Sequence, residues 1–173
     1  MSIELLSKLE RAVQVRNSVL AGALLPGLSE AKIRRMLHRK GVAGNVDPIV
    51  MLFGWKDGYN IEALLPPEQQ QLFPQSEFLF MDLDFMLGHF EMLKEFAKYH
   101  PEFTEVAGRF FPLFWTGSKC WIAVDLDTSQ GSRVVLIDRK SQTLVREVYV
   151  SFEEFLKDAI RANEVNDKLS FLK

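Results

Sequence analysis

The hydrophobic pattern changes period near residue 109, and this change constrains the fold more than any other feature of the chain. Upstream, apolar residues such as Met86, Phe90 and Leu93 recur at the spacing of one helix face. From Phe110 to Val150, short apolar runs separated by turn residues are typical of strands. Helices followed by a run of strands favour an α+β fold over a parallel α/β sheet, in which the two would alternate.

The first third of the chain is predicted to be mainly helical. One amphipathic helix is expected over Leu5–Leu20, ending near Gly22, and a turn is expected at Leu24–Leu28. Ser29 is predicted to cap a second helix. Asp47, followed by a proline, is predicted to cap a third.

The middle of the chain is predicted to hold one buried strand and the main core helix. Phe78–Met81 is a short apolar run typical of a buried strand. Asp82 or Asp84 is expected to cap the helix that follows, which reaches about Tyr99. Its apolar stripe is broad, as expected for a helix that is buried on one side.

The second half is predicted to form an antiparallel meander and a final helix. Its four strands are expected at Phe110–Trp115, Lys119–Leu126, Arg133–Asp138 and Thr143–Val150, with turns at 116–118, 129–131 and 139–142. Pro112 places the first strand at an edge or at a bulge, because proline donates no ladder hydrogen bond. Ser151 and Glu154 form a capping box for the final helix.

Composition indicates one globular domain over residues 1–173. Hydrophobic residues make up 47% of the chain and charged residues 25%, which excludes a disordered or coiled-coil chain. Cys120 is the single cysteine, so no intramolecular disulfide can form and a reducing compartment is expected. No apolar run approaches a membrane span and the N-terminus does not resemble a signal peptide, so we expect a cytoplasmic protein without a membrane partner.

The strongest catalytic candidate is the pair Asp125 and Asp127, which follows an apolar strand. This D-x-D-x-T pattern resembles the nucleophile motif of haloacid-dehalogenase-type phosphatases, in which two carboxylates attack phosphorus and help to hold Mg²⁺. Only 46 residues follow Asp127, too few for the later strands and metal ligands of that fold. Acids where a strand enters a turn are the favoured interpretation.

Metal, cofactor and nucleic-acid sites are not expected. Asp82 and Asp84 are better explained as helix-capping residues than as metal ligands, and the three histidines and the cysteine fall at no zinc-ligand spacing. The basic run Lys32–Lys40 can bind phosphate but is more typical of a solvated helix face. The aromatic residues of 110–121 lack interleaved basic residues, and the net charge of −2 is far from that of a nucleic-acid-binding domain.

The near-neutral total conceals an uneven distribution of charge. Residues 61–105 carry nine carboxylates against two lysines, a charge of −7, whereas the rest of the chain carries +5. Such a segment is either a solvated helix face or a surface that attracts a basic partner. If it is a binding surface, the candidate contact residues are Asp82, Asp84, Glu91, Glu95, Glu102 and Glu105.

Four short motifs, in this order along the chain, resemble the SUKH superfamily (SMI/KNR-like domains). They are Leu25-Pro26 before a helix, Leu-Phe-Gly-Trp-Lys-Asp-Gly at Leu52–Gly58, Phe111–Phe114 turning into Trp121–Asp125, and Val148–Leu156. The likeness covers residues 24–162, between an N-terminal helix in 1–23 and a C-terminal tail at 163–173. The superfamily contains bacterial immunity proteins of polymorphic toxin systems and a fungal cell-wall synthesis regulator.

The resemblance implies a non-catalytic protein-binding module, because the superfamily is not known as an enzyme class. It implies structural roles for Pro26, Trp55, Asp57, Gly58, Pro112, Asp125 and Phe155. We therefore expect an immunity protein that neutralises a cognate toxin, with a basic toxin domain as its partner. A regulatory or scaffold protein of the same family is the alternative, and a Mg²⁺-dependent phosphatase that uses Asp125 and Asp127 is a further one.

Overall fold

The computed structural model describes residues 2–117, 119–127, 132–140 and 143–173, and these form an α+β fold. Their α-helices are α1 (Ser2–Arg16), α2 (Ser18–Ala23), α3 (Glu30–Arg39), α4 (Asp47–Trp55), α5 (Leu83–Phe96) and α6 (Phe152–Glu164). Their strands are β1 (Leu24–Pro26), β2 (Lys56–Tyr59), β3 (Phe110–Thr116), β4 (Cys120–Asp125), β5 (Val134–Asp138) and β6 (Val145–Tyr149). The predicted fold class is confirmed.

The second half of the chain forms the predicted antiparallel meander, in the order β3-β4-β5-β6. Both expectations for Pro112 are confirmed, because β3 lies at the edge of this sheet and its register shifts between Pro112 and Phe114. Parts of the predicted turns, at residues 118, 129–131 and 141–142, lie outside the described residues. The switch to a strand period therefore identified the sheet and its strand order.

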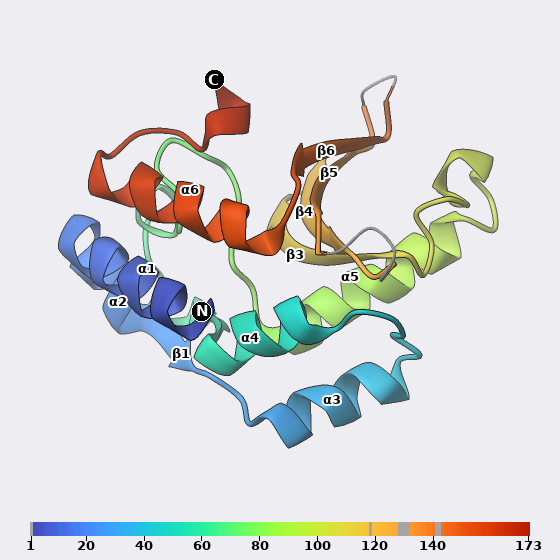
Figure 1. Cartoon of the computed structure of the whole chain (residues 1–173), viewed down its shortest axis with the longest axis horizontal. Helices are drawn as coiled ribbons and strands as arrows, with labels where there is room; N and C mark the ends of the chain where they lie inside the picture. Colours follow the sequence, from blue (N-terminus) through green and yellow to red (C-terminus); the bar gives the residue numbers. More distant parts are fainter. Residues whose placement is uncertain (1, 118, 128–131, 141–142) are drawn as a thin grey trace.

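The core lies between the four-stranded sheet and the helices around it. Figure 1 shows α1 and α6 side by side, and α5 runs beneath β3 towards the opposite end of the molecule. Phe73, Phe114 and Phe155 are fully buried and contact one another with ring centroids 4.9 to 5.6 Å apart. These rings connect the loop after β2, the edge strand and α6 into one core.

The single N-terminal helix predicted over residues 5–20 is wrong, because the chain breaks at Asn17. The Asn17 side chain accepts a hydrogen bond from the Leu20 amide (3.0 Å) and so caps α2. Its amide group also donates to the Gln69 carbonyl (3.0 Å). Asparagine competes with the helix for backbone hydrogen bonds, and here it starts a new helix in another direction.

The turn predicted at residues 24–28 is also wrong in part, because Leu24–Pro26 forms β1. This strand pairs antiparallel with β2, with Leu24 opposite Tyr59 and Pro26 opposite Lys56. Glycine is required at position 27, directly after β1, because a Cβ atom there would lie 1.9 Å from the Gly54 carbonyl oxygen. The strand depends on a partner 30 residues away, which local turn chemistry does not reveal.

Most helix caps are confirmed. The side chains of Ser29, Asp82 and Ser151 each accept a hydrogen bond from an amide in the first turn of α3, α5 and α6. The cap of α4 is displaced by one residue, because Val46 takes that position and Asp47 is the first helical residue. Helix α5 ends at Phe96 rather than near Tyr99.

One further segment differs from its prediction. Residues 78–81 form no regular strand, only a single bridge between Leu79 and Trp115. The C-terminal tail is held to α6, because the Asp158 carboxylate accepts hydrogen bonds from the Ser170 amide and hydroxyl (2.6 and 2.7 Å). Leu169 is buried beneath it. In the part of the chain described, no helix is both long and apolar enough to cross a membrane.

Candidate functional site

The carboxylate at the end of β4 is the most constrained charged group of the structure. Asp125 is fully buried, and its Oδ1 accepts hydrogen bonds from Arg109 Nε (3.1 Å) and the Asp127 amide (3.0 Å). Its Oδ2 accepts from Arg109 Nη2 (3.0 Å) and Arg133 Nε (2.7 Å). Each oxygen therefore accepts two hydrogen bonds, and two guanidinium groups balance one negative charge.

The protonation of Asp125 follows from these contacts. Burial raises its pKa, but the hydrogen bonds from Arg109, the Asp127 amide and Arg133 lower it more, so that the pKa lies below its ordinary value. The carboxylate is ionised and its lone pairs are occupied. Asp127 is near the same group, with its carboxylate 3.8 Å from Arg109 Nη2. The arrangement suits a structural ion cluster better than a nucleophile, which needs an accessible oxygen.

The two arginines join the edge of the sheet to its far strand. Both guanidinium groups lie over the Phe110 ring, 5.1 and 6.0 Å from its centroid. Arg133 also reaches Glu147 on β6 (3.3 Å). A hollow of about 470 Å³ opens beside them, with Glu105 and Glu147 among its lining residues. Its charges are mixed, so the hollow does not select an anion over a cation.

The Trp-Lys-Asp-Gly element at Trp55–Gly58 contacts the N-terminus of α5. The Asp57 carboxylate accepts a hydrogen bond from the Leu83 amide (2.9 Å), and burial raises its pKa. Gly58 has φ +76°, and a Cβ atom there would lie 2.4 Å from the Asp82 nitrogen. Asp57 and Asp82 thus bind two of the free amides of α5, which is a structural use of this motif.

The remaining motif residues also serve the fold. Trp55 stacks on Phe80 with centroids 6.3 Å apart, and its Nε1 donates to Glu10 (3.1 Å). Pro26 lies in β1, Pro112 lies directly before the register shift in β3, and Phe155 is fully buried. A role in the scaffold is consistent with each of these positions.

The acidic residues fall into two groups. Asp82 caps α5, Glu91 pairs with Lys40 (2.8 Å), and Glu95 pairs with Lys98 (2.6 Å). The structure brings Lys40 to α5 from the end of α3, so part of the segment charge is neutralised. Asp84, Glu102 and Glu105 are exposed and have no Lys or Arg nitrogen within 4 Å among the described residues.

Two of the three exposed carboxylates, Glu102 and Glu105, lie near one end of the molecule, whereas Asp84 lies in the first turn of α5. We call residues 95–105 the α5–η3 tip: they comprise the end of α5, a turn and a short 3₁₀ helix, η3 (Pro101–Phe103). Figure 1 shows this part, in yellow-green, projecting from the body of the protein. The side chain of Tyr99 is 79% exposed there, between Glu95 and Glu102 in sequence. The charge count predicted the carboxylates of the tip but not the aromatic residue.

The basic run Lys32–Lys40 lies on the exposed face of α3, and the aromatic residues of 110–121 lie mostly in the core. On α3, Arg34 pairs with Glu30 (2.7 Å) and Asp47 (3.1 Å). Among the aromatic residues, Phe110, Phe111, Phe114 and Trp121 are buried. The aromatic group thus belongs to the core, whereas Lys32, Arg35 and Arg39 of the basic run are exposed on α3.

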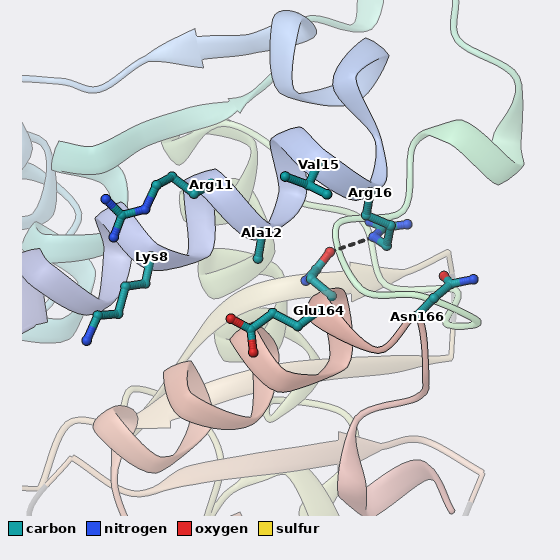
Figure 2. Close-up of a pocket in the computed structure, with 8 residues that line it drawn as sticks. Lys8, Arg11, Ala12, Val15, Arg16, Glu164 and Asn166 are labelled. Atoms are coloured by element: carbon teal, nitrogen blue, oxygen red, sulfur yellow. Dashed lines mark hydrogen bonds between the residues drawn. The ribbon is translucent and has the colours of Figure 1, made fainter.

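A hollow between α1 and α6 was not predicted (Figure 2). Its volume is about 640 Å³, and its lining includes Lys8, Arg11, Val15, Arg16 and Glu164. Arg16 is committed to the fold: its Nε donates to Asn163 Oδ1 (2.6 Å) and its Nη2 to the Gln71 and Leu72 carbonyls (2.7 and 3.1 Å). The Arg16 side chain therefore joins α1 to α6 and to the loop at Gln71 and Leu72.

Comparison with known proteins does not extend this picture. No family model matches the chain, and no curated protein matches it. Within the described residues, no three His, Cys, Asp or Glu side chains are grouped so that they can hold a metal ion.

Proposed function

We propose that this chain is a cytoplasmic, non-catalytic binding module that neutralises a basic toxin domain by occluding it, as SUKH immunity proteins do. The observation that carries the proposal is Tyr99, a large aromatic side chain that is 79% exposed on a projecting tip that also carries Glu95, Glu102 and Glu105. Tyrosine is enriched among residues that dominate binding energy, because it offers a large contact area with little rotamer freedom to lose.

The charge around Tyr99 fits a basic partner. Glu102 and Glu105 lie beyond it on and after η3, both exposed, and neither has a Lys or Arg nitrogen within 4 Å in the described part of the chain. Carboxylates at the rim of an interface raise the rate of association with a basic surface and disfavour acidic partners. Tyr99 then supplies the contact that slows dissociation.

The use of Asp125 supports a non-catalytic role. The carboxylate that a phosphatase would need is fully buried and has four hydrogen-bond donors around it. Releasing an oxygen for attack on phosphorus would break hydrogen bonds that Arg109 or Arg133 donates to this buried carboxylate, which is costly for a buried ion cluster.

Co-expression with the product of a neighbouring toxin gene tests the proposal. The wild-type chain is expected to restore growth and to co-purify with the toxin. Tyr99→Ala and the double variant Glu102→Lys/Glu105→Lys are expected to lose rescue, whereas the controls Val165→Ala and Glu164→Lys, at exposed positions near the end of α6, retain it. Rescue by the tip variants equal to wild type would contradict the assignment of the tip, and absence of both rescue and complex with wild type would contradict the function.

A further inference from the structure

A second surface, at the end of the molecule opposite the α5–η3 tip, has a different character. A hollow of about 470 Å³ opens where α2 and β1 meet the chain after β2, and Figure 1 shows α2 and β1 far from the end of α5. None of its lining residues is charged: Val19, Gly22, Ala23, Leu24, Leu25, Pro26, Asn60, Ala63 and Leu65. We call it the α2–η1 hollow, after α2 and the 3₁₀ helix η1 (Ile61–Ala63).

Large apolar side chains on the wall of this hollow, or next in sequence to its lining residues, are exposed to solvent. Val19 on its wall is 51% exposed, and Ile61 and Leu64, next in sequence to lining residues, are 62% and 86% exposed. A single exposed leucine is ordinary on a protein surface, but several apolar side chains around an uncharged hollow are typical of a binding site.

The backbone of Leu64 is a second, independent indication. Leu64 has φ 48° and ψ 41°, the left-handed conformation, and its amide donates to the Ile61 carbonyl (3.2 Å) as η1 ends. A residue with a Cβ atom adopts this conformation at an energetic cost, and such strained residues cluster at functional sites. Here the strain presents a leucine to solvent, where the fold gains nothing from it.

The charges beside the hollow decide which partner fits. Glu62 lies between Ile61 and Ala63, and Glu68 lies in a 3₁₀ turn held to the start of α2 by the hydrogen bond from Asn17 to the Gln69 carbonyl (3.0 Å). Both carboxylates are exposed, and within the described residues neither has a Lys, Arg or His nitrogen within 4 Å. A second copy of this chain would place like charges across the interface, which disfavours self-association.

We propose that the α2–η1 hollow binds a short peptide segment of another protein, one whose apolar side chains are flanked by lysine or arginine. The apolar side chains enter the hollow between Val19 and Leu64, and the flanking cations face Glu62 and Glu68. The proposal does not depend on the α5–η3 tip, which lies at the other end of the molecule, and the two surfaces are tested with different variants.

The test uses the full chain and two synthetic peptides, Lys-Lys-Leu-Ile-Leu-Lys-Lys and Glu-Glu-Leu-Ile-Leu-Glu-Glu, with binding measured by fluorescence anisotropy. Leu64→Gly removes the side chain and also removes the conformational cost, so its fold is expected to be at least as stable as that of wild type. The charge variant is Glu62→Lys/Glu68→Lys. The matched controls, at exposed positions elsewhere, are Val150→Ser and Glu77→Lys.

Wild type is expected to bind the lysine peptide and not the glutamate peptide, more weakly as salt is raised. Leu64→Gly is expected to weaken binding about tenfold, in line with the loss of one buried leucine contact. The double charge variant is expected to reverse the preference between the peptides, and the controls are expected to bind as wild type. The proposal is overturned if the lysine peptide fails to bind at millimolar concentration, if both peptides bind equally, or if Leu64→Gly binds as wild type. It is also overturned if sedimentation shows a dimer that Leu64→Gly dissociates, since the occupant is then a second copy.

Discussion

At the scale of single residues, Asp125 shows what a sequence pattern can and cannot predict. The D-x-D pattern identified Asp125 as important, and the choice between a catalytic and a structural role depended on its neighbours. Arg109 and Arg133 lie 16 and 8 residues away, and only the folding of β3, β4 and β5 brings them to Asp125. Burial of Asp125 with two guanidinium groups supports the structural role that the sequence already favoured, but no local pattern could have shown which arginines surround it.

Asp125→Asn tests that structural role. The substitution keeps the shape of the side chain but removes the buried negative charge that Arg109 and Arg133 share, and leaves them the more exposed carboxylates of Asp127 and Glu147. Removing one partner of a buried ion pair costs about 3–5 kcal/mol, and we expect about 2–3 kcal/mol here because the Arg109 side chain is partly exposed to solvent. Urea unfolding measures the change in the free energy of unfolding, with Glu164→Gln as the exposed control. A loss below about 0.5 kcal/mol, the range of ordinary surface substitutions, would show that the cluster does not stabilise the fold.

His89 makes the stability depend on pH. Its Nδ1 accepts a hydrogen bond from Trp121 Nε1 (3.2 Å), and burial lowers its pKa below the usual 6.5. The folded protein thus favours the neutral ring, so the contribution of His89 is present above pH 6.5 and is lost as the pH falls through the lowered pKa. Urea unfolding between pH 7.5 and 5 should show wild type losing more stability than His89→Gln. Equal slopes for the two proteins would rule out this role.

At the scale of elements, local chemistry predicted most of what is local and missed what depends on distant partners. Ser29, Asp82 and Ser151 cap their helices as expected, because a cap needs only the next three residues. Strand β1 was missed because it depends on β2. The break at Asn17 was also missed, although its cap of α2 is local; the bond to the Gln69 carbonyl adds a distant contact. The second cap of α5, from Asp57, likewise comes from 26 residues away.

Two glycines provide a matched test of how β2 positions α5. Gly58→Ala places a Cβ atom 2.4 Å from the Asp82 nitrogen at φ +76°, and we expect a loss of at least about 2 kcal/mol. Gly22→Ala, in α2, meets no atom within 4 Å and should stabilise the protein by about 0.5–1 kcal/mol through helix propensity. Thermal unfolding separates the two. A Gly58→Ala protein as stable as wild type would mean that β2 and the start of α5 are not held closely.

At the scale of the whole molecule, the fold separates two surfaces. The α5–η3 tip presents Tyr99 among carboxylates, and the α2–η1 hollow lies at the other end (Figure 1). The charge count predicted an acidic segment, but the structure pairs Glu91 and Glu95 with lysines, which moves the candidate contact residues towards Glu102 and Glu105. Lys40 lies 51 residues before Glu91 in the sequence. A count of charges along the chain therefore could not have shown that the two side chains pair.

If the tip binds a basic partner with Tyr99 as its anchor, the kinetics of the complex with the toxin should depend on Tyr99 and on the carboxylates of the tip. Surface plasmon resonance with wild type, Tyr99→Ala and Glu102→Lys/Glu105→Lys measures association and dissociation rates at several salt concentrations. We predict that Tyr99→Ala raises the dissociation rate about thirtyfold, the equivalent of about 2 kcal/mol. The charge variant should lower the association rate and weaken its salt dependence. Unchanged rates for both variants would contradict the account.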